Sequence, residues 1–199
     1  MDNLFPPVSA LSNDARRSLM GQNPMVIWFT GLSGAGKTTL ALLLENQLNE
    51  RGFKSFRLDG DHVRKGLCSD LGFLTSDRTE NVRRVAEVAA LMKDAGLITI
   101  VSLISPLKSD RELARRISGI GFMEVFVDCT VEECIRRDVK GLYAKAQSGA
   151  IAEFTGISAS YEKPENPDLI LNTDKETPSS CVQQLLAHIL PLITHHVKS

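Results

Sequence analysis

The chain has 199 residues, and its 23 Lys and Arg against 24 Asp and Glu leave a formal net charge of −1. This length suits one domain with a single sizeable core, and the balanced charge excludes a global field that would draw the chain to nucleic acid or to an anionic membrane. No apolar run approaches the roughly 18 residues of a membrane span and no leader-like segment opens the chain, so we expect a soluble, cytoplasmic protein.

Four cysteines are spread along the chain without a C-x-x-C pair and without metal-ligand spacing to the four histidines. We therefore expect buried free thiols at Cys68, Cys129, Cys134 and Cys181. Free thiols favour a reducing compartment.

The first 24 residues predict an arm outside the core, because prolines, asparagines and a glycine interrupt only scattered apolar side chains. Such an arm either stays loose or packs its apolar residues on a partner subunit. The folded domain is expected to span residues 25–199.

Residues 25–40, MVIWFTGLSGAGKTTL, predict a buried strand, a glycine-rich loop and a helix that runs to about Arg51. The loop matches G-x-x-x-x-G-K-[ST], in which backbone N–H groups wrap an anion, the Lys reaches the β- and γ-phosphates, and the Thr hydroxyl holds Mg²⁺. An ordinary glycine-rich turn is the alternative, but the flanking strand and helix favour the phosphate loop. The expected nucleotide contacts are Gly31, Leu32, Ser33, Gly34, Ala35, Gly36, Lys37, Thr38 and Thr39.

Strands and helices alternate along the rest of the chain, which predicts an α/β fold of the P-loop NTPase type, with a parallel sheet covered by helices on both faces. The strands are expected at Ser55–Leu58, Leu97–Ile104, Phe122–Val127 and Asp168–Leu171. The helices are expected from about Asp77 to Asp94 with Glu80 in a capping box, and at Ser109–Ile117, Val131–Arg137 and Ser179–Leu192. Periodicity disappears between about 139 and 158, where two lysines favour a mobile lid over a plain surface loop.

Polar groups follow the predicted strands at Asp59, Asp61 and Ser105, and in a parallel sheet the ligand sits beyond these strand ends. Turn residues are the alternative explanation for the two aspartates. The strand at 97–104 ends without the aspartate that usually serves Mg²⁺ in this fold, so we expect Asp59 and Asp61 to replace it beside Thr38.

Arg78 falls on the apolar face of the helix that begins near Asp77. At about 100° per residue, Val82, Val85 and Ala89 lie within about 40° of Arg78, and Asn81 lies beside it. An arginine on such a face needs an anionic partner, which is either a ligand beyond the strand ends or an internal aspartate. Arg83 and Arg84 fall on the opposite face and are expected to be solvated surface charges. Arg64 follows the two aspartates, and a basic side chain at such a position is usually only solvated.

Longer motifs resemble the adenylylsulfate (APS) kinase family, from about Pro24 to about Thr173. They are GLSGAGKTT, LDGDHVRKGLCSDLGF, DRTENVRRVAEVAALMKDAG, LISP, DRELAR, DVKGLYAKA, FTGIS, YEKPENPDL and LNT. Enzymes of this family phosphorylate the 3′-hydroxyl of adenosine 5′-phosphosulfate (APS) with MgATP and produce PAPS for sulfate assimilation. The resemblance therefore implies a homodimeric kinase with ATP and APS as substrates, Mg²⁺ as cofactor and a functional link to ATP sulfurylase.

The resemblance also implies roles for single residues. Asp59 lies near the attacking hydroxyl, and Lys37 and Ser105 complete the catalytic set. Arg64, Arg78 and Asn81 clamp the phosphosulfate, Phe73 and Phe154 stack on the APS adenine, and Arg137 lies against the ATP adenine. The remaining substrate contacts are Asp61, Ile104, Ser105 and Lys140, the last on the closing lid.

Two positions depart from the family pattern, His62 where Asn is usual and Leu103 where Phe is frequent. His62 adjoins Asp59 and is expected to affect the pH dependence, whereas Leu103 is expected to be a packing change. The family's serine at Ser105 is described as a phosphorylated intermediate. We expect hydrogen bonding to substrate there instead, because P-loop kinases transfer the phosphoryl group directly.

Two other functions are compatible with the phosphate loop. One is a P-loop kinase for another hydroxylated metabolite, such as gluconate or shikimate, and the other is a nucleotide-binding switch or a non-catalytic APS-binding module. No N-K-x-D guanine motif is present, which disfavours a GTPase.

Overall fold

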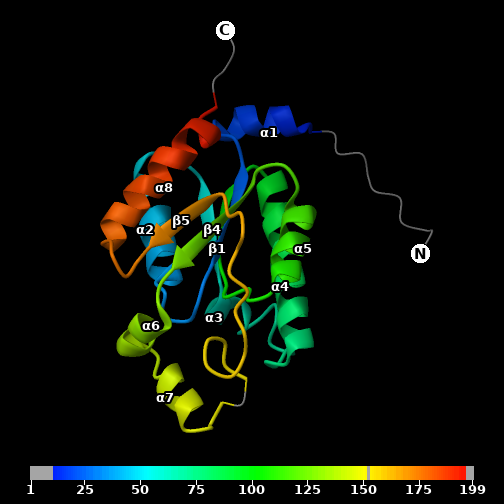
Figure 1. Cartoon of the computed structure of the whole chain (residues 1–199). Helices are drawn as coiled ribbons and strands as arrows, with labels where there is room; N and C mark the ends of the chain where they lie inside the picture. Colours follow the sequence, from blue (N-terminus) through cyan, green and yellow to red (C-terminus); the bar gives the residue numbers. More distant parts are fainter. Residues whose placement is uncertain (1–10, 152, 196–199) are drawn as a thin grey trace, which may run out of the picture.

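The computed structural model describes residues 11–151 and 153–195. Its five strands form one parallel sheet in the order β2-β3-β1-β4-β5, so the predicted fold class is confirmed. The strands are β1 Met25–Thr30, β2 Ser55–Asp59, β3 Ile98–Ser102, β4 Phe122–Asp128 and β5 Leu169–Asn172. Because every strand runs in the same direction, all carboxyl ends meet at one edge of the sheet, at the bottom of Figure 1.

Helices cover both faces of the sheet (Figure 1). α2 (Lys37–Glu50) and α8 (Pro178–Ile193) pack together on one face, and α4 (Thr75–Asp94) and α5 (Lys108–Ser118) pack together on the other. The short helices α3 (Gly60–Val63), α6 (Val131–Arg137) and α7 (Leu142–Gln147) all lie toward the carboxyl edge. No helix in the described part of the chain is long and apolar enough to span a bilayer.

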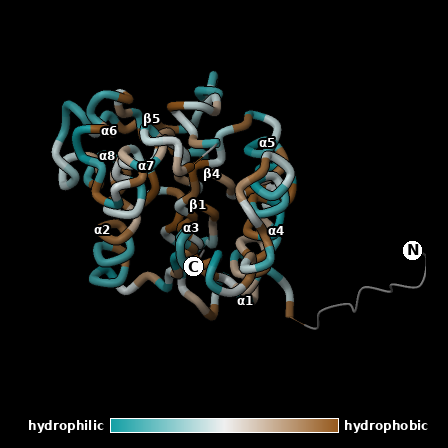
Figure 2. Tube along the Cα trace, turned by 90° about the horizontal axis from the view of Figure 1, so that it is seen from below, coloured by the Kyte–Doolittle hydropathy of each residue, from teal (hydrophilic) through white to brown (hydrophobic). Residues whose placement is uncertain are grey.

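The core has two halves, one on each side of the sheet. In β1 every residue is buried, and the alternation of side chains sends Phe29 to the α2/α8 half and Trp28 to the α4/α5 half. Seen from below, hydrophobic segments gather around β1 and β4, while hydrophilic residues dominate the outer sides of the helices (Figure 2). The four cysteines are buried free thiols, as predicted.

The first helix after the loop agrees with its prediction apart from one side chain. α2 ends at Glu50, and Leu40, Leu44 and Leu48 are buried. Leu43, expected on the same face, is 36% exposed. The apolar stripe of α2 is therefore narrower than its leucine content indicates.

The helix around Arg78 begins earlier than expected, and its predicted capping box is wrong. α4 starts at Thr75 after Leu74, which makes no side-chain cap. The carboxylate of Glu80 instead accepts hydrogen bonds from Arg83 and Arg84 one turn on. Arg84 also pairs with Asp70 (2.7 Å), so it is not the freely solvated charge that the helical face predicts.

Part of the predicted N-terminal arm belongs to the body of the protein. α1 (Asn13–Met20) is capped by the hydroxyl of Ser12, and Gln22 is fully buried. The Gln22 amide bonds Lys54 through both the N–H and the carbonyl, and it also bonds the Gly96 carbonyl. Residues 1–10 lie outside the described residues.

The segment expected to be an irregular lid contains a helix. α7 begins after Gly141, whose φ of 63° suits glycine, and the carboxylate of Asp138 accepts hydrogen bonds from the N–H groups of Tyr143 and Ala144 in its first turn. Two turns of helix are too short to produce a recognisable period in a sequence, which is why the pattern predicted a loop.

Candidate active site

The phosphate loop joins β1 to α2 through three glycines with left-handed backbone. Their φ angles are 149° at Gly31, 77° at Gly34 and 99° at Gly36. A Cβ at Gly31 would lie 2.6 Å from the carbonyl oxygen of Val127, so no other residue fits there without moving β4. The loop is thus formed by glycine geometry and by packing on the neighbouring strand.

Lys37 lies folded against this loop. Its ammonium donates to the carbonyls of Gly31 (2.8 Å) and Leu32 (2.7 Å), and the residue is 8% exposed. Burial lowers the pKa of Lys37 from its usual 10.5 to about 8. The positive charge is therefore held at the loop without a directly bound carboxylate among the described residues.

Thr38 and Asp59 meet beside the loop. The Thr38 hydroxyl donates to Oδ2 of Asp59 (2.8 Å), and Oδ1 of Asp59 accepts from the N–H of Asp61 (3.1 Å), which caps α3. The Asp61 carboxylate itself pairs with Lys140 and does not share this contact. Among the described residues no cluster of three His, Cys, Asp or Glu could hold a metal ion, so any cation here depends on oxygens from few protein groups.

Arg137 and Thr173 border the other side of the loop. The Arg137 guanidinium donates to the Thr173 carbonyl (2.6 Å) and pairs with Glu133 (2.8 Å), and the Thr173 hydroxyl donates to the Ala35 carbonyl (2.8 Å). Thr173 is not among the site residues that the sequence predicts. Its position two residues after the last predicted strand, in the LNT segment, is the sequence signal that could have indicated it.

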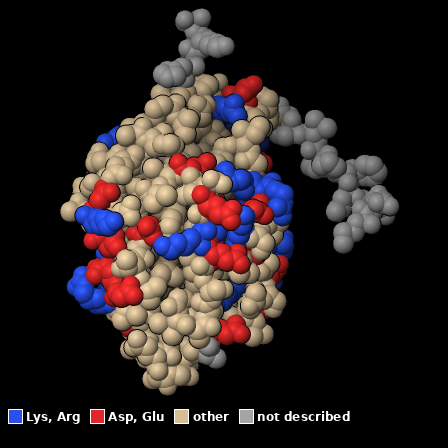
Figure 3. Space-filling view, viewed as in Figure 1, with Lys and Arg blue, Asp and Glu red and all other residues tan. Residues whose placement is uncertain are grey.

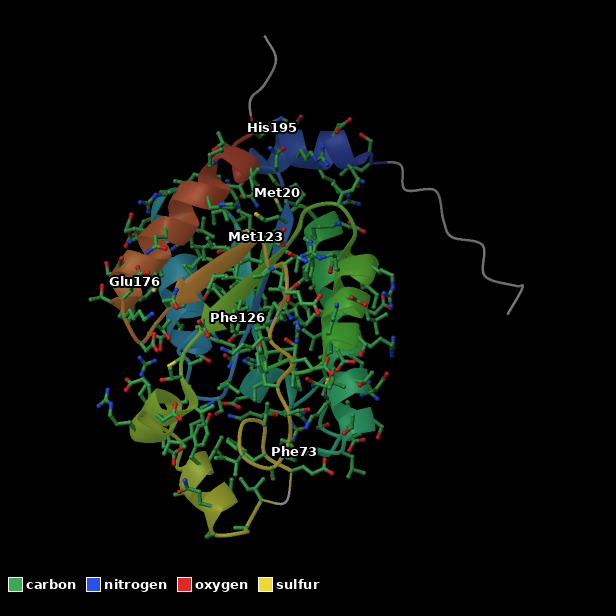
Figure 4. All side chains as sticks on the ribbon, in the orientation of Figure 1. Met20, Phe73, Met123, Phe126, Glu176 and His195 are labelled. Atoms are coloured by element: carbon green, nitrogen blue, oxygen red, sulfur yellow. The ribbon has the colours of Figure 1, made fainter. Side chains whose placement is uncertain are left out.

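Arg64 and Phe73 lie on the segment between α3 and α4. The guanidinium of Arg64 is 4.6 Å from the centre of the Phe73 ring and donates to the Gly72 carbonyl (3.0 Å). Phe73 is 65% exposed. It lies at the carboxyl edge, at the opposite end of the molecule from Met20 and His195 (Figure 4).

Arg78 reaches from the first turn of α4 to the segment after α7. Its guanidinium donates to the Phe73 carbonyl (2.8 Å), the Thr155 hydroxyl (2.6 Å) and the Glu153 carbonyl. No carboxylate of the described residues forms an ion pair with it, so the internal salt bridge left open by the sequence is absent there. Burial lowers the pKa of Arg78, but an arginine stays charged.

Asn81 lies one turn after Arg78 and is 4% exposed. Its side-chain nitrogen has no hydrogen-bond partner among the described residues. Buried amide groups are nearly always paired, so this donor suits a ligand.

Ser105 follows β3 in an unusual backbone conformation. It is 2% exposed, its φ is 41°, and its hydroxyl accepts a hydrogen bond from the indole N–H of Trp28 (3.1 Å). The carbonyl of Ile104, the preceding residue, accepts from the Thr30 hydroxyl (2.8 Å). The contact with Trp28 joins residues 77 positions apart and has no local sequence signal.

The segment predicted to be a lid contacts the phosphate loop and Asp61. Lys140 pairs with Asp61, and the Tyr143 hydroxyl donates to the Ser33 carbonyl (2.9 Å). The ring of Phe154 packs edge-on against Tyr143 at 4.9 Å and is 7% exposed. Phe73 and Phe154 thus differ in exposure. Arg78 donates to the carbonyl of Phe73 and to that of Glu153, the residue before Phe154.

The chain matches one family model over most of its length, the model for adenylylsulphate kinase, at residues 23–172. The adenylyl-sulfate kinase of Clostridium acetobutylicum is 51% identical over 174 residues, which make up 87% of each chain. The bifunctional enzyme NodQ of a Rhizobium species is 50% identical over 189 residues, which are 94% of this chain and 30% of that longer protein.

A solved structure agrees with these relatives. The APS kinase of Mycobacterium tuberculosis, in complex with AMPPNP and APS, is 46% identical and has a TM-score of 0.82, covering 84% of this chain and 98% of the other. Together with the phosphate loop and the parallel sheet, these matches show that the chain belongs to the adenylylsulfate kinase family.

Proposed function

We propose that this chain transfers the γ-phosphoryl group of ATP to the 3′-hydroxyl of APS, giving PAPS and ADP. The observation that carries the acceptor assignment is the guanidinium of Arg78, which is partly buried and has carbonyl and hydroxyl partners but no ion-paired carboxylate among the described residues. A partly buried cation without an ion pair favours an anionic ligand, and a phosphosulfate offers planar groups of oxygens to an arginine fork.

The nucleotide side of the site consists of the phosphate loop, Lys37 and Arg137. The loop amides and Lys37 bind the β- and γ-phosphates, and Arg137 lies against the ATP adenine. The buried ammonium of Lys37 supports this role, because a charge held out of water interacts strongly with an arriving phosphate.

The acceptor side consists of the residues around Arg78. Asp59 orients or deprotonates the attacking 3′-hydroxyl, Arg64 joins Arg78 on the phosphosulfate, and the Asn81 amide donates to it. Phe73 and Phe154 stack on the APS adenine. Ser105 donates a hydrogen bond to substrate. Its hydroxyl already accepts from Trp28, and none of the described residues is hydrogen-bonded to it as a general base that would make it a nucleophile.

The oxygens of Thr38 and Asp59 fit Mg²⁺, because this ion takes one or two protein oxygens together with waters and phosphates. When bound, it neutralises charge that develops on the phosphate oxygens. The sequence predicts that Asp61 helps to hold Mg²⁺. Its pairing with Lys140 supports a different role, in which Asp61 holds the lid segment 139–158 over the bound substrates.

Two wider proposals rest on single observations. A functional link to ATP sulfurylase is supported by the bifunctional relative, which is about three times as long as the matched segment. A cytoplasmic location is supported by four buried free cysteines, which suit a reducing compartment.

The function is tested by incubating the protein with MgATP and APS, gluconate, shikimate or no acceptor, while ADP release is followed. We expect ADP and a 3′-phosphorylated nucleotide with APS only. Turnover of a sugar acid without turnover of APS would establish the rival kinase, and tight APS binding without ADP would establish a binding module.

Replacement of Phe73 by Ala separates APS from a sugar acceptor. We expect KM for APS to rise about five- to 150-fold, since stacking of a base on an aromatic ring is worth about 1–3 kcal/mol. The matched control is Phe56→Ala. Phe56 is also an exposed phenylalanine but lies on β2, and its replacement should leave KM for APS unchanged. A KM for APS that is the same in Phe73→Ala as in the wild type would contradict stacking of the APS adenine on Phe73.

A further inference from the structure

Arg111, on α5, is almost completely buried, and it makes more contacts than its ion pair requires. Its Nε lies 2.9 Å from Oε1 of Glu124, and the two side chains are 2% and 11% exposed. The two terminal nitrogens are directed elsewhere: one donates to the carbonyls of Ser105 (2.9 Å) and Pro106 (3.2 Å), and the other to the carbonyl of Glu162 (2.7 Å). One side chain thus joins three separate segments.

The first of these segments is the corner that follows β3. Ser105 has a φ of 41°, a left-handed value that non-glycine residues adopt at some energetic cost. Such a conformation persists only where the surroundings hold it. Here Trp28 donates to the hydroxyl of Ser105, while Thr30 and Arg111 donate to its carbonyl.

The second segment is the stretch through which the chain leaves the proposed lid. The N–H of Glu162 donates to the Pro106 carbonyl (2.9 Å), and its carboxylate accepts from the N–H of Lys108 (2.6 Å). The hydroxyl of Tyr161 is hydrogen-bonded to Thr30 (2.9 Å), and the Arg111 guanidinium lies 5.8 Å from the centre of the Tyr161 ring. The corner and the lid exit are therefore fastened to the same arginine.

The geometry requires an arginine in particular. A guanidinium presents five N–H donors in a fixed plane, so it can pair with Glu124 and still reach three carbonyls. A lysine would keep the charge opposite Glu124 but could not hold both segments. Buried ion pairs contribute little net stability against apolar replacements, so stability alone does not account for this arrangement.

We propose that Arg111 is a positioning residue for the acceptor: it holds the Ser105 corner and the lid exit in one arrangement, so that the acceptor contact at Ser105 and the closed lid are set together. This inference rests on the proposed function, in which Ser105 contacts APS. Arg111 itself touches no reacting atom and acts through Ser105 and Glu162.

Arg115 provides a matched control on the same helix. It lies one turn after Arg111 and contacts the same carboxylate, Oε2 of Glu124 (3.6 Å), together with Asp168 (2.7 Å). It is 41% exposed, and its ion pairs and hydrogen bond within the described residues reach neither the corner nor the lid exit. Arg111→Lys and Arg115→Lys therefore perturb the same ion-pair network, and only the first releases the two segments.

The test measures KM for APS and for ATP separately in the wild type, Arg111→Lys and Arg115→Lys. We expect Arg111→Lys to raise KM for APS about tenfold or more, the effect of losing hydrogen bonds to a charged donor, with KM for ATP and both KM values of Arg115→Lys within about twofold. Unchanged KM for APS in Arg111→Lys, or equal changes in both variants, would overturn the inference.

A second readout keeps the test decisive where Arg111→Lys folds poorly. Trp28 is the single tryptophan of the chain and donates to Ser105, so its fluorescence reports on the corner. Tyr161→Phe removes only the bond to Thr30, and we expect it to raise KM for APS about two- to tenfold and to alter the Trp28 response to APS. This variant leaves Arg111 in place and tests the coupling itself, so no change in either quantity would show that the lid exit and the Ser105 corner are not set together.

The wild-type measurement separates the two proposals. If the wild type releases no ADP with APS, the proposed function fails and this inference fails with it. If the wild type turns over APS and the Arg111 and Tyr161 variants match it, only the inference fails.

Discussion

Lys37 keeps its charge at a place that water hardly reaches. Its neighbours are the carbonyls of Gly31 and Leu32, and burial lowers its pKa to about 8. Bound phosphates favour the protonated amine and raise this pKa again, because opposite charges stabilise each other. Nucleotide binding by the free enzyme is therefore linked to proton uptake above about pH 8.

This linkage predicts a pH dependence for the nucleotide. KM for ATP should stay flat below about pH 8 and rise above it, by at most about tenfold per pH unit, because the neutral amine must first take up a proton. Steady-state kinetics across this range checks the prediction, with KM for APS as the internal control. A KM for ATP that stays level well above pH 8 would show that Lys37 is still protonated there.

Single residues were predictable where their signal was local. Glycine spacing predicted the conformations of Gly31, Gly34 and Gly36, and helical periodicity placed Arg78 on the inner face of its helix. Thr155, which accepts a hydrogen bond from Arg78, lies 77 positions further along the sequence, and no spacing rule indicates this contact. The same holds for Trp28 with Ser105, so these contacts required the folded structure.

The helices and strands of the sheet were predictable because each carries a strong apolar pattern and clear ends. α6 begins and ends at the predicted residues, since Thr130 caps its first turn. The start of α4 was missed because Leu74 supplies no cap, and α7 was missed because it is short. The lid helix is held by tertiary contacts, above all the bond from Tyr143 to the Ser33 carbonyl.

Tyr143→Phe tests how this element is held. The variant keeps the ring against Phe154 and removes one hydrogen bond to the phosphate loop. We expect faster amide exchange in α7 and unchanged exchange in α8, because the bond joins only α7 to the loop. Equal protection of α7 in both proteins would show that the ring contact alone holds the helix.

At the scale of the whole molecule, Gln22 anchors the start of the first strand. The side chain of Gln22 joins the residues before β2 and β3, and the backbone N–H of Asn23 donates to the carbonyl of Ile193 at the end of α8. On the face shown in Figure 3, Lys and Arg side chains are interspersed with Asp and Glu, in line with the net charge of −1. The homodimer implied by the family resemblance stays a prediction, which light scattering of the purified protein checks.

Gln22→Ala should destabilise the whole molecule. The change leaves the buried carbonyl of Gly96 and the part-buried N–H of Lys54 without the Gln22 partner, so we expect the free energy of unfolding to fall by about 1–3 kcal/mol. Urea denaturation measures this change. Gln47→Ala, at a glutamine whose partners are exposed, is the control and should cost less than about 0.5 kcal/mol.

The most direct test of the acceptor assignment is kcat/KM for APS, with ATP saturating, in the wild type, Arg78→Ala and Arg83→Ala. Both variants remove an arginine from α4, but Arg83 faces solvent and pairs with Glu80. We expect Arg78→Ala to lose at least about tenfold and Arg83→Ala to stay within about twofold. Wild-type kcat/KM in a folded Arg78→Ala protein would contradict recognition of the phosphosulfate by this arginine.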